Sequence, residues 1–177
     1  MADRGRDPWD HPHPMHRIHL IGPSCAGKTT LGRWLAGRLG LSFVDLDELF
    51  WEPGWVEVGH EELARRLAPH VARDGWVVAG NYHATTERLV WPRADTLLVL
   101  DLPYTRVMAR ALRRTLWRGL TGERCCNGNR ESLLRLFHRD GILRYTHRHW
   151  APRQRRYAAL GAHRALAQAT VLRFQSA

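Results

Sequence analysis

The chain has 177 residues, 44% of them hydrophobic and 25% charged, which is the composition of a globular protein of one domain. It contains no apolar run of ~18 residues that could span a membrane, and residues 1–15 lack the apolar core of a secretory signal. We therefore expect a cytoplasmic protein without a membrane partner. The formal net charge is +10, and Lys28 is the single lysine among 27 basic residues, which suggests that this position needs the compact ammonium of lysine.

Residues 1–15 are rich in proline, histidine and charge and show no periodicity, so we expect a disordered tail before a domain that spans residues 16–177. In that domain, apolar strands alternate with amphipathic helices. The strands are predicted at 17–22, 41–47, 75–81, 94–103 and 170–174, and the helices at 29–40, 60–74, 104–119, 131–150 and 153–169. Strands that are nearly all apolar are typical of a parallel sheet buried on both faces, which predicts an α/β fold of three layers, α/β/α.

A glycine-rich loop joins the first predicted strand to the first predicted helix. The sequence GPSCAGKT at residues 22–29 matches the phosphate-binding pattern G-x-x-x-x-G-K-[ST], with the strand before it and the helix after it that this motif requires. Backbone N–H groups of such a loop and the positive end of the helix bind phosphate oxygens. The residues expected to bind ATP are Gly22, Pro23, Ser24, Cys25, Ala26, Gly27, Lys28, Thr29 and Thr30.

Three of these residues have side chains with separate predicted roles. Lys28 is expected to reach the β- and γ-phosphates and to act in catalysis, Thr29 to ligate Mg²⁺, and Thr30 to bond the α-phosphate. The helix that follows should end at Gly40. From spacings of three and four residues, its core-facing side chains are predicted to be Leu31, Trp34, Leu35 and Leu39.

Asp45 and Asp47 stand two residues apart at the C-terminal end of the second predicted strand. Alternation along a strand places both side chains on one face, at the sheet edge where ligands of parallel α/β proteins bind. We predict that Asp45 holds Mg²⁺ and that Asp47 orients or deprotonates an acceptor hydroxyl. The alternative for Asp45 is an N-cap of a following helix, completed by Glu48 in a D-x-x-E box. Trp51 and Trp55 fit either the wall of an acceptor pocket or ordinary packing.

Arginines gather near the segment at about 118–130, which is punctuated by glycines and predicted to act as a lid. The planar guanidinium suits the charge that phosphoryl transfer spreads over phosphate oxygens, so Arg114, Arg118 and Arg124 are predicted to act in catalysis. The alternative is a solvated basic face. Asp101 ends the apolar run LLVLD within the strand predicted at 94–103. It is expected either to hold Mg²⁺ through water or to cap the next helix.

Several segments together resemble the adenylate-kinase-related P-loop proteins, some of which are labelled DNA topology modulation proteins. The segments are IHLIGPSCAGKTTLGRWLAGRLG, FVDLDELFWEPGW, WVVAGNY, ADTLLVLDLP and the arginine-rich RRTLWRG. The resemblance covers about residues 17–150 and implies a P-loop NTPase fold like that of nucleoside monophosphate kinases. Such a fold has a five-stranded parallel sheet, ATP at the loop and an arginine-rich lid. The D-x-D pair is also similar to that of shikimate and gluconate kinases, in which it serves the metal and the acceptor hydroxyl.

Two further positions follow from the resemblance. The segment RQRRY is similar to the nucleotide-base segment of those kinases, which implies that Arg153 contacts the bound nucleotide. Ala79 stands in VVAGNY where this group often has an aspartate, so a carboxylate useful for metal binding is missing.

These features predict an ATP-dependent kinase that moves the γ-phosphate of ATP, with Mg²⁺, to a nucleotide or a small hydroxylated metabolite. The alternative is a nucleotide-binding regulator or weak ATPase that contacts nucleic acid, which the net charge of +10 would favour. The kinase is preferred because the sequence has no helix-turn-helix, zinc-finger or RNA-binding signature. The expected partners are a nucleoside triphosphate and an unknown small acceptor, and both a monomer and a homodimer are compatible with the sequence.

Overall fold

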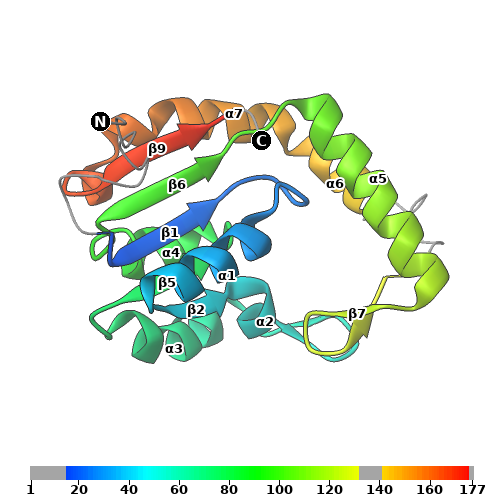
Figure 1. Ribbon diagram of the computed structural model, residues 1–177, viewed down its shortest axis with the longest axis horizontal. Coiled ribbons are helices and arrows are strands. Elements are labelled where there is room, and N and C mark those ends of the chain that lie inside the picture. Colours follow the sequence, from blue (N-terminus) through cyan, green and yellow to red (C-terminus); the bar gives the residue numbers. More distant parts are fainter. Residues whose placement is uncertain (1–14, 132–140, 176–177) are drawn as a thin grey trace, which may run out of the picture.

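The computed structural model describes residues 15–131 and 141–175, and its centre is a five-stranded parallel sheet (Figure 1). The strands are β1 (Arg17–Ile21), β2 (Ser42–Asp45), β5 (Trp76–Ala79), β6 (Thr96–Leu100) and β9 (Thr170–Phe174). They lie in the order β2-β5-β1-β6-β9, and every neighbouring pair is parallel. The predicted three-layer α/β fold and its five-stranded sheet are confirmed.

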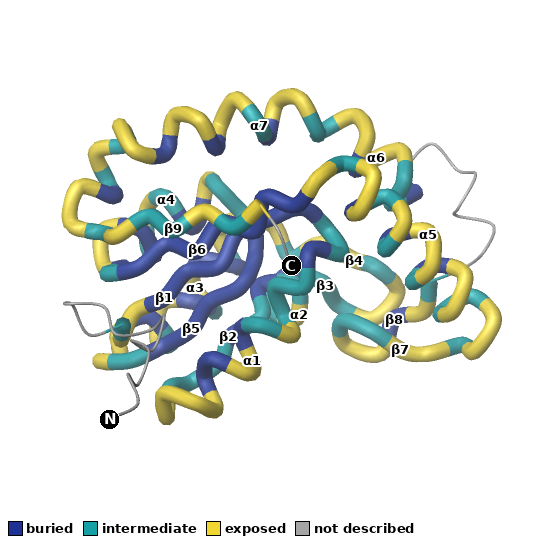
Figure 2. The backbone as a smooth tube through the Cα atoms, turned by 45° about the horizontal axis from the view of Figure 1, so that its top comes forward, coloured by how far each residue is buried: buried dark blue, intermediate teal, exposed yellow. Residues whose placement is uncertain are grey.

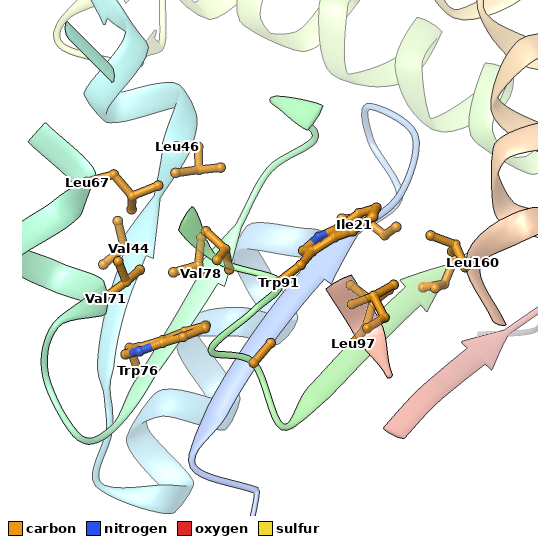
Figure 3. Packing of buried hydrophobic residues seen from close by; sticks show 14 of the residues in the cluster. Ile21, Val44, Leu46, Leu67, Val71, Trp76, Val78, Trp91, Leu97 and Leu160 are labelled. Atoms are coloured by element: carbon orange, nitrogen blue, oxygen red, sulfur yellow. The ribbon is translucent and has the colours of Figure 1, made fainter. Parts of the chain in front are cut away.

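Helices cover both faces of the sheet, so the strands run as the buried centre between two exposed layers (Figure 2). On one face, α3 (His60–Val71), α4 (His83–Leu89) and α7 (Trp150–Ala159) enclose a large apolar cluster. Figure 3 shows this cluster, with Trp76 and Trp91 among side chains from β1, β2, β5 and β6. On the other face, α1 (Lys28–Leu39) packs Leu35 and Ala36 against Ile18, Leu20 and Val77.

The packed face of α1 differs from the predicted one. Its buried residues are Gly32, Leu35 and Ala36, whereas Trp34 and Leu39 are 50% and 42% exposed. The reason is close packing on β2, because a Cβ added at Gly32 would lie 2.4 Å from the ring of Phe43. Leu35 is packed as predicted and Leu31 is partly buried against the same cluster, whereas Trp34 and Leu39 point away from the contact at Gly32. Gly40 ends the helix in the left-handed conformation, as predicted.

A second group of elements lies beyond the carboxyl ends of the strands. Helix α2 (Leu46–Phe50) follows β2 directly and leads into a hairpin of β3 (Trp51–Glu52) and β4 (Val56–Glu57). The long helix α5 (Tyr104–Thr121) leads into another hairpin, of β7 (Arg124–Cys125) and β8 (Asn129–Arg130). Figure 1 shows the two hairpins side by side, and α6 (Ile142–Arg148) next to α5.

Several predicted elements change in the structure. The helix predicted over 153–169 ends at Ala159. Two 3₁₀ turns follow it, Leu160–Ala162 and Arg164–Leu166, and they are separate because His163 between them is extended. Of the helix predicted over 131–150, α6 is described and residues 132–140 lie outside the described part, as does the tail up to residue 14. Within 15–131 and 141–175, none of the helices has the length and apolar character needed to cross a bilayer.

Candidate active site

The loop between β1 and α1 has the conformation that its sequence predicts. Gly27 adopts a φ of 98° and Cys25 a φ of 66°, both left-handed, which curls the backbone before the first turn of α1. Gly22 is required for a different reason, since a Cβ there would lie 2.8 Å from the carbonyl oxygen of Leu100. The Lys28 ammonium donates to the carbonyl oxygens of Gly22 and Pro23 at 3.0 and 3.1 Å. The loop is thus preformed as an anion cradle.

Asn81 clamps the start of this loop. Its Nδ2 donates to the carbonyl oxygen of Gly22 at 2.6 Å, and its Oδ1 accepts from the Gly22 amide at 3.0 Å. The preceding Gly80 packs against Leu46, which a Cβ at that position would approach to 2.7 Å. The end of β5 therefore fixes both the phosphate loop and the start of α2.

Asp45 is the N-cap of α2, as the alternative prediction had it, and its role in holding Mg²⁺ remains a prediction. Its Oδ2 accepts from the Thr29 hydroxyl at 2.8 Å, and its Oδ1 accepts from the amide of Asp47 at 3.1 Å, as an N-cap of α2. Glu48 instead binds Arg33 at 3.2 Å. Burial raises the pKa of Asp45, and the charge of Asp47 raises it further. A partly buried carboxylate beside a threonine hydroxyl is a fitting place for a divalent cation, which would offset this charge.

Asp47 lies in the first turn of α2, in contact with Tyr82. The predicted placement of Asp45 and Asp47 on one face of a strand is therefore wrong, because β2 ends at Asp45 and the chain turns directly into a helix. The Tyr82 hydroxyl donates to Asp47 Oδ1 at 2.6 Å. Burial lowers the pKa of Lys28, and the carboxylates of Asp47 and Asp45 oppose that change, so the ammonium and both carboxylates share one electrostatic environment. The structure thus brings together the lysine predicted to bind phosphate and the aspartate predicted to bind the acceptor.

The predicted lid arginines form an internal ion network. Glu131 Oε1 accepts from Arg118 Nη1 at 2.9 Å and lies 3.3 Å from Arg114 Nη2. Burial raises the pKa of the Cys25 thiol, and the positive charge of Arg114 opposes the rise, which places this network beside the phosphate loop. Arg124 is exposed at the start of β7, across the hairpin from Arg130. Catalytic roles for Arg114, Arg118 and Arg124 remain predictions.

Arg153 and Asp101 occupy different environments. Arg153 is buried in α7 with its Nη1 atom unpartnered, and its charge also lowers the pKa of Lys28, after the larger effect of burial. Asp101 accepts from Gln154 Nε2 at 2.6 Å through one oxygen and pairs with Arg173 through the other. It does not cap α5, whose N-cap is Pro103 without a side-chain hydrogen bond. Nucleotide contact by Arg153 and metal binding by Asp101 remain predictions.

Two residues of the site were missing from the sequence-based prediction. Asn81 and Tyr82 belong to the segment WVVAGNY, which carried the family resemblance without an assigned role. Their position directly after a buried strand, where ligands of parallel sheets bind, is the signal that could have found them. Ala79, where the related proteins often have an aspartate, is buried and in register with Asp45, so a carboxylate there would add a buried acid beside Asp45.

The fold and the phosphate loop define a P-loop protein of the kinase-like class, and comparisons with known proteins make this likeness more specific. A family model described as shikimate kinase matches residues 24–53, from the loop through Asp45 and Asp47 to the start of the β3–β4 hairpin. The predicted resemblance to P-loop kinases, which include adenylate, shikimate and gluconate kinases, is confirmed.

Curated relatives and solved structures agree with that match. The chain is 42% identical over 64 residues to shikimate kinase of Oleidesulfovibrio alaskensis and 43% over 70 residues to that of Phocaeicola vulgatus. These alignments cover 36% and 33% of the chain and only 32% and 39% of the relatives' lengths. Shikimate kinase of Bacteroides thetaiotaomicron has a TM-score of 0.55 at 20% identity, over 92% of this chain and 87% of its own. The Acinetobacter baumannii enzyme in complex with shikimate gives 0.52 at 18%, over 92% and 86%, so the fold is shared.

Proposed function

We propose that this protein is an ATP-dependent kinase that transfers the γ-phosphate of ATP to a hydroxyl of a small hydroxylated carboxylic acid, with shikimate as the first candidate. The observation that carries the proposal is the meeting of Lys28, Asp45 and Asp47 at the ends of adjacent elements, in one electrostatic environment. Supporting it are the shikimate kinase model, which matches this part of the chain, and a fold shared with an enzyme solved with shikimate.

We assign a separate role in the reaction to each residue of the site. The loop amides and Lys28 bind the phosphates. To do so, the ammonium exchanges its hydrogen bonds to the carbonyl oxygens of Gly22 and Pro23 for bonds to the incoming phosphate oxygens. Asp47 accepts a hydrogen bond from the acceptor hydroxyl, orients its oxygen toward the γ-phosphate and takes its proton as the new O–P bond forms. Tyr82 holds the Asp47 carboxylate in place through the 2.6 Å hydrogen bond. We assign the neutralisation of the phosphate oxygens to Arg114 and Arg118, which would exchange Glu131 for substrate.

The site fits Mg²⁺ as a partner of ATP. Among residues 15–131 and 141–175, no cluster of three histidine, cysteine or acidic side chains is arranged to hold a metal. Mg²⁺ does not need one, because it commonly uses one or two protein oxygens together with phosphate oxygens and water. Thr29 and Asp45 supply such oxygens, and the ion would draw charge from the phosphates when bound.

A carboxylate on the acceptor explains the buried arginine. The Nη1 atom of Arg153 is a buried donor without a hydrogen-bond partner. Burying such a charged donor costs free energy unless an anion accepts a hydrogen bond from it. Its charge acts on Lys28, so it belongs to the same region of the molecule. We assign it to the acid group of the acceptor in preference to the nucleotide base.

The competing function is a nucleic-acid-binding regulator or weak ATPase, and the comparisons favour the kinase over it. The net charge of +10 is compatible with both, because a protein that binds phosphates is also expected to be basic.

A coupled assay of ADP release tests the proposal. Purified protein with Mg²⁺ and ATP is incubated with shikimate, gluconate, nucleoside monophosphates or buffer alone, and the phosphorylated product is identified by mass spectrometry. We expect shikimate or a similar hydroxylated acid to raise ADP release at least ~100-fold over buffer, as general-base catalysis and positioning require. Equal rates with every acceptor and with buffer would contradict the proposal, and preference for a nucleoside monophosphate would redirect it.

A further inference from the structure

The hairpin after α5 is bound to the hairpin after α2 by an asparagine whose hydrogen-bonding groups are all used. Asn129 is 4% exposed. Its Oδ1 accepts from the amides of Gly54 and Trp55 at 2.8 and 2.9 Å, and its Nδ2 donates to the carbonyl oxygens of Glu52 and Cys126 at 2.9 and 2.7 Å. Three of these four bonds cross from β7–β8 to β3–β4, between residues 74 to 77 positions apart in the chain.

Two further side chains extend the contact. Asn127 Nδ2 donates to the carbonyl oxygens of Glu48 and Trp51, each at 2.7 Å, and Trp55 Nε1 donates to the carbonyl oxygen of Arg130 at 3.1 Å. Asn127 has a positive φ of 56°, which asparagine tolerates better than most residues. The turn between β7 and β8 is therefore shaped to present both asparagines to the backbone of the other hairpin.

The joined hairpins border the acceptor side of the candidate active site. Asp47 lies in α2, and β3 begins at Trp51, directly after that helix. Asn127, in the β7–β8 turn, donates to the carbonyl oxygen of Glu48, the residue after Asp47, so this turn lies near Asp47. At the far end of the same hairpin, Glu131 binds Arg114 and Arg118. One short segment thus connects the acceptor side to the arginines on the phosphate side.

We propose that Asn127 and Asn129 fasten the two hairpins into a single wall of the acceptor pocket, and that Asn129 is a positioning residue for acceptor binding. The segment at 124–130 then does not move as an independent lid over the nucleotide. It moves together with β3–β4. When the two hairpins close on the acceptor, Glu131 at the end of the segment also repositions Arg114 and Arg118. This inference rests on the proposed kinase function only in naming the pocket's occupant.

Hydrogen exchange of the full-length protein, without ligand, tests the fastening itself. In Asn129→Ala the amides of Gly54 and Trp55 lose their acceptor, so we expect exchange in peptides covering 51–57 and 124–130 to rise together by roughly tenfold or more. Asn127→Ala removes two of the bonds and should give a smaller rise in the same peptides. Val56→Thr is the matched control, because Val56 is 59% exposed in the same hairpin and should leave exchange unchanged. Unchanged exchange in Asn129→Ala, or an equal rise in the phosphate-loop peptide at 20–30, would overturn the proposal.

Steady-state kinetics test the positioning role. Asn129→Ala should raise the KM for the acceptor by roughly tenfold while the KM for ATP changes less than about twofold. Equal increases in both KM values, or a lower kcat with both KM values unchanged, would contradict a role in acceptor positioning. If no acceptor supports turnover by the wild-type protein, the proposed function fails, whereas the exchange experiment still decides whether the hairpins act as one body.

Discussion

The two sides of the candidate site are built in different ways. The core of the phosphate side is local in sequence, because one loop and the first turn of one helix supply the backbone curvature, the amides and Lys28, and Asn81 clamps that loop from outside. The acceptor side is assembled from residues far apart in the chain, with Tyr82 on Asp47 and Asn129 on the β3–β4 hairpin. The phosphate side is therefore a fixed cradle, whereas the acceptor side depends on a few side-chain hydrogen bonds that can be altered one at a time.

Removal of the ammonium breaks the phosphate side and should have the largest effect. Lys28→Ala is expected to lower kcat/KM for ATP by ~10³-fold or more, because the variant loses the desolvated positive charge that stabilises the transferring phosphate. Lys28→Arg is the control for charge alone, and it should recover little, since a planar guanidinium does not fit a cradle shaped for an ammonium. Steady-state kinetics measure both variants. Turnover of Lys28→Ala within tenfold of wild type would remove the phosphate side from the mechanism.

Asp47→Asn breaks the acceptor side while keeping its shape. The amide can still accept from Tyr82, but it cannot take a proton, so we expect kcat to fall by ~100-fold or more with little change in the KM for ATP. Steady-state kinetics with saturating acceptor measure this change. A kcat within tenfold of wild type would assign the base to another group.

The buried strand beneath the phosphate loop should make stability depend on pH. His19 lies between the carbonyl oxygen of Gly80 and the indole N–H of Trp91, at 3.0 and 2.9 Å. Burial lowers its pKa to about 3 from 6.5, so the neutral ring is the folded form. Its contribution to stability is present above pH ~6.5 and is lost as pH falls toward 3, at up to about 1.4 kcal/mol per pH unit.

The variant His19→Gln isolates this effect from the titration of carboxylates. Glutamine can donate to Gly80 and accept from Trp91 but does not titrate. Urea unfolding between pH 6.5 and pH 4 should therefore show a flatter pH dependence for the variant than for wild type. Parallel curves for the two proteins would contradict the assignment of His19 as a neutral structural residue.

On the acceptor side, the smallest effect is expected from the loss of the Tyr82 hydroxyl. Tyr82→Phe removes the hydrogen bond to Asp47 and keeps the ring contact with Phe50, whose centroid lies 4.5 Å away. Loss of one such bond, worth about 1 kcal/mol, should lower kcat/KM for the acceptor by roughly fivefold. The KM for ATP should stay as in wild type, which distinguishes a local effect from a loosened site.

The contrast between the two sides also explains what the sequence could predict. The loop and the alternation of strands and helices are periodic or local patterns, and the structure has them where they were expected. The D-x-D pair does lie at the end of β2, but Asp47 belongs to α2 and not to the strand. The packed face of α1 was predicted correctly for Leu31 and Leu35 but wrongly for Trp34 and Leu39, because the approach of Gly32 to Phe43 depends on another strand. Asn81, Tyr82 and Asn129 act through partners 35 to 77 residues away, and no spacing rule within one element identifies such pairs.

The predicted lid illustrates the same limit. Glycines and arginines near 118–130 indicated a segment that could close over the nucleotide. In the structure its first residues complete α5, Gly122 caps that helix, and the remainder forms the hairpin held by Asn129. Composition identified the segment, but only the tertiary hydrogen bonds show which other part of the site it is attached to.

Direct calorimetric titration with a non-hydrolysable ATP analogue and Mg²⁺ is the sharpest test of the central claim that one loop and its lysine hold the nucleotide. Wild type and Asn129→Ala should bind the analogue with the same affinity, whereas Lys28→Ala should bind at least tenfold more weakly. Absence of binding by wild type, or equal affinity in Lys28→Ala, would contradict the account.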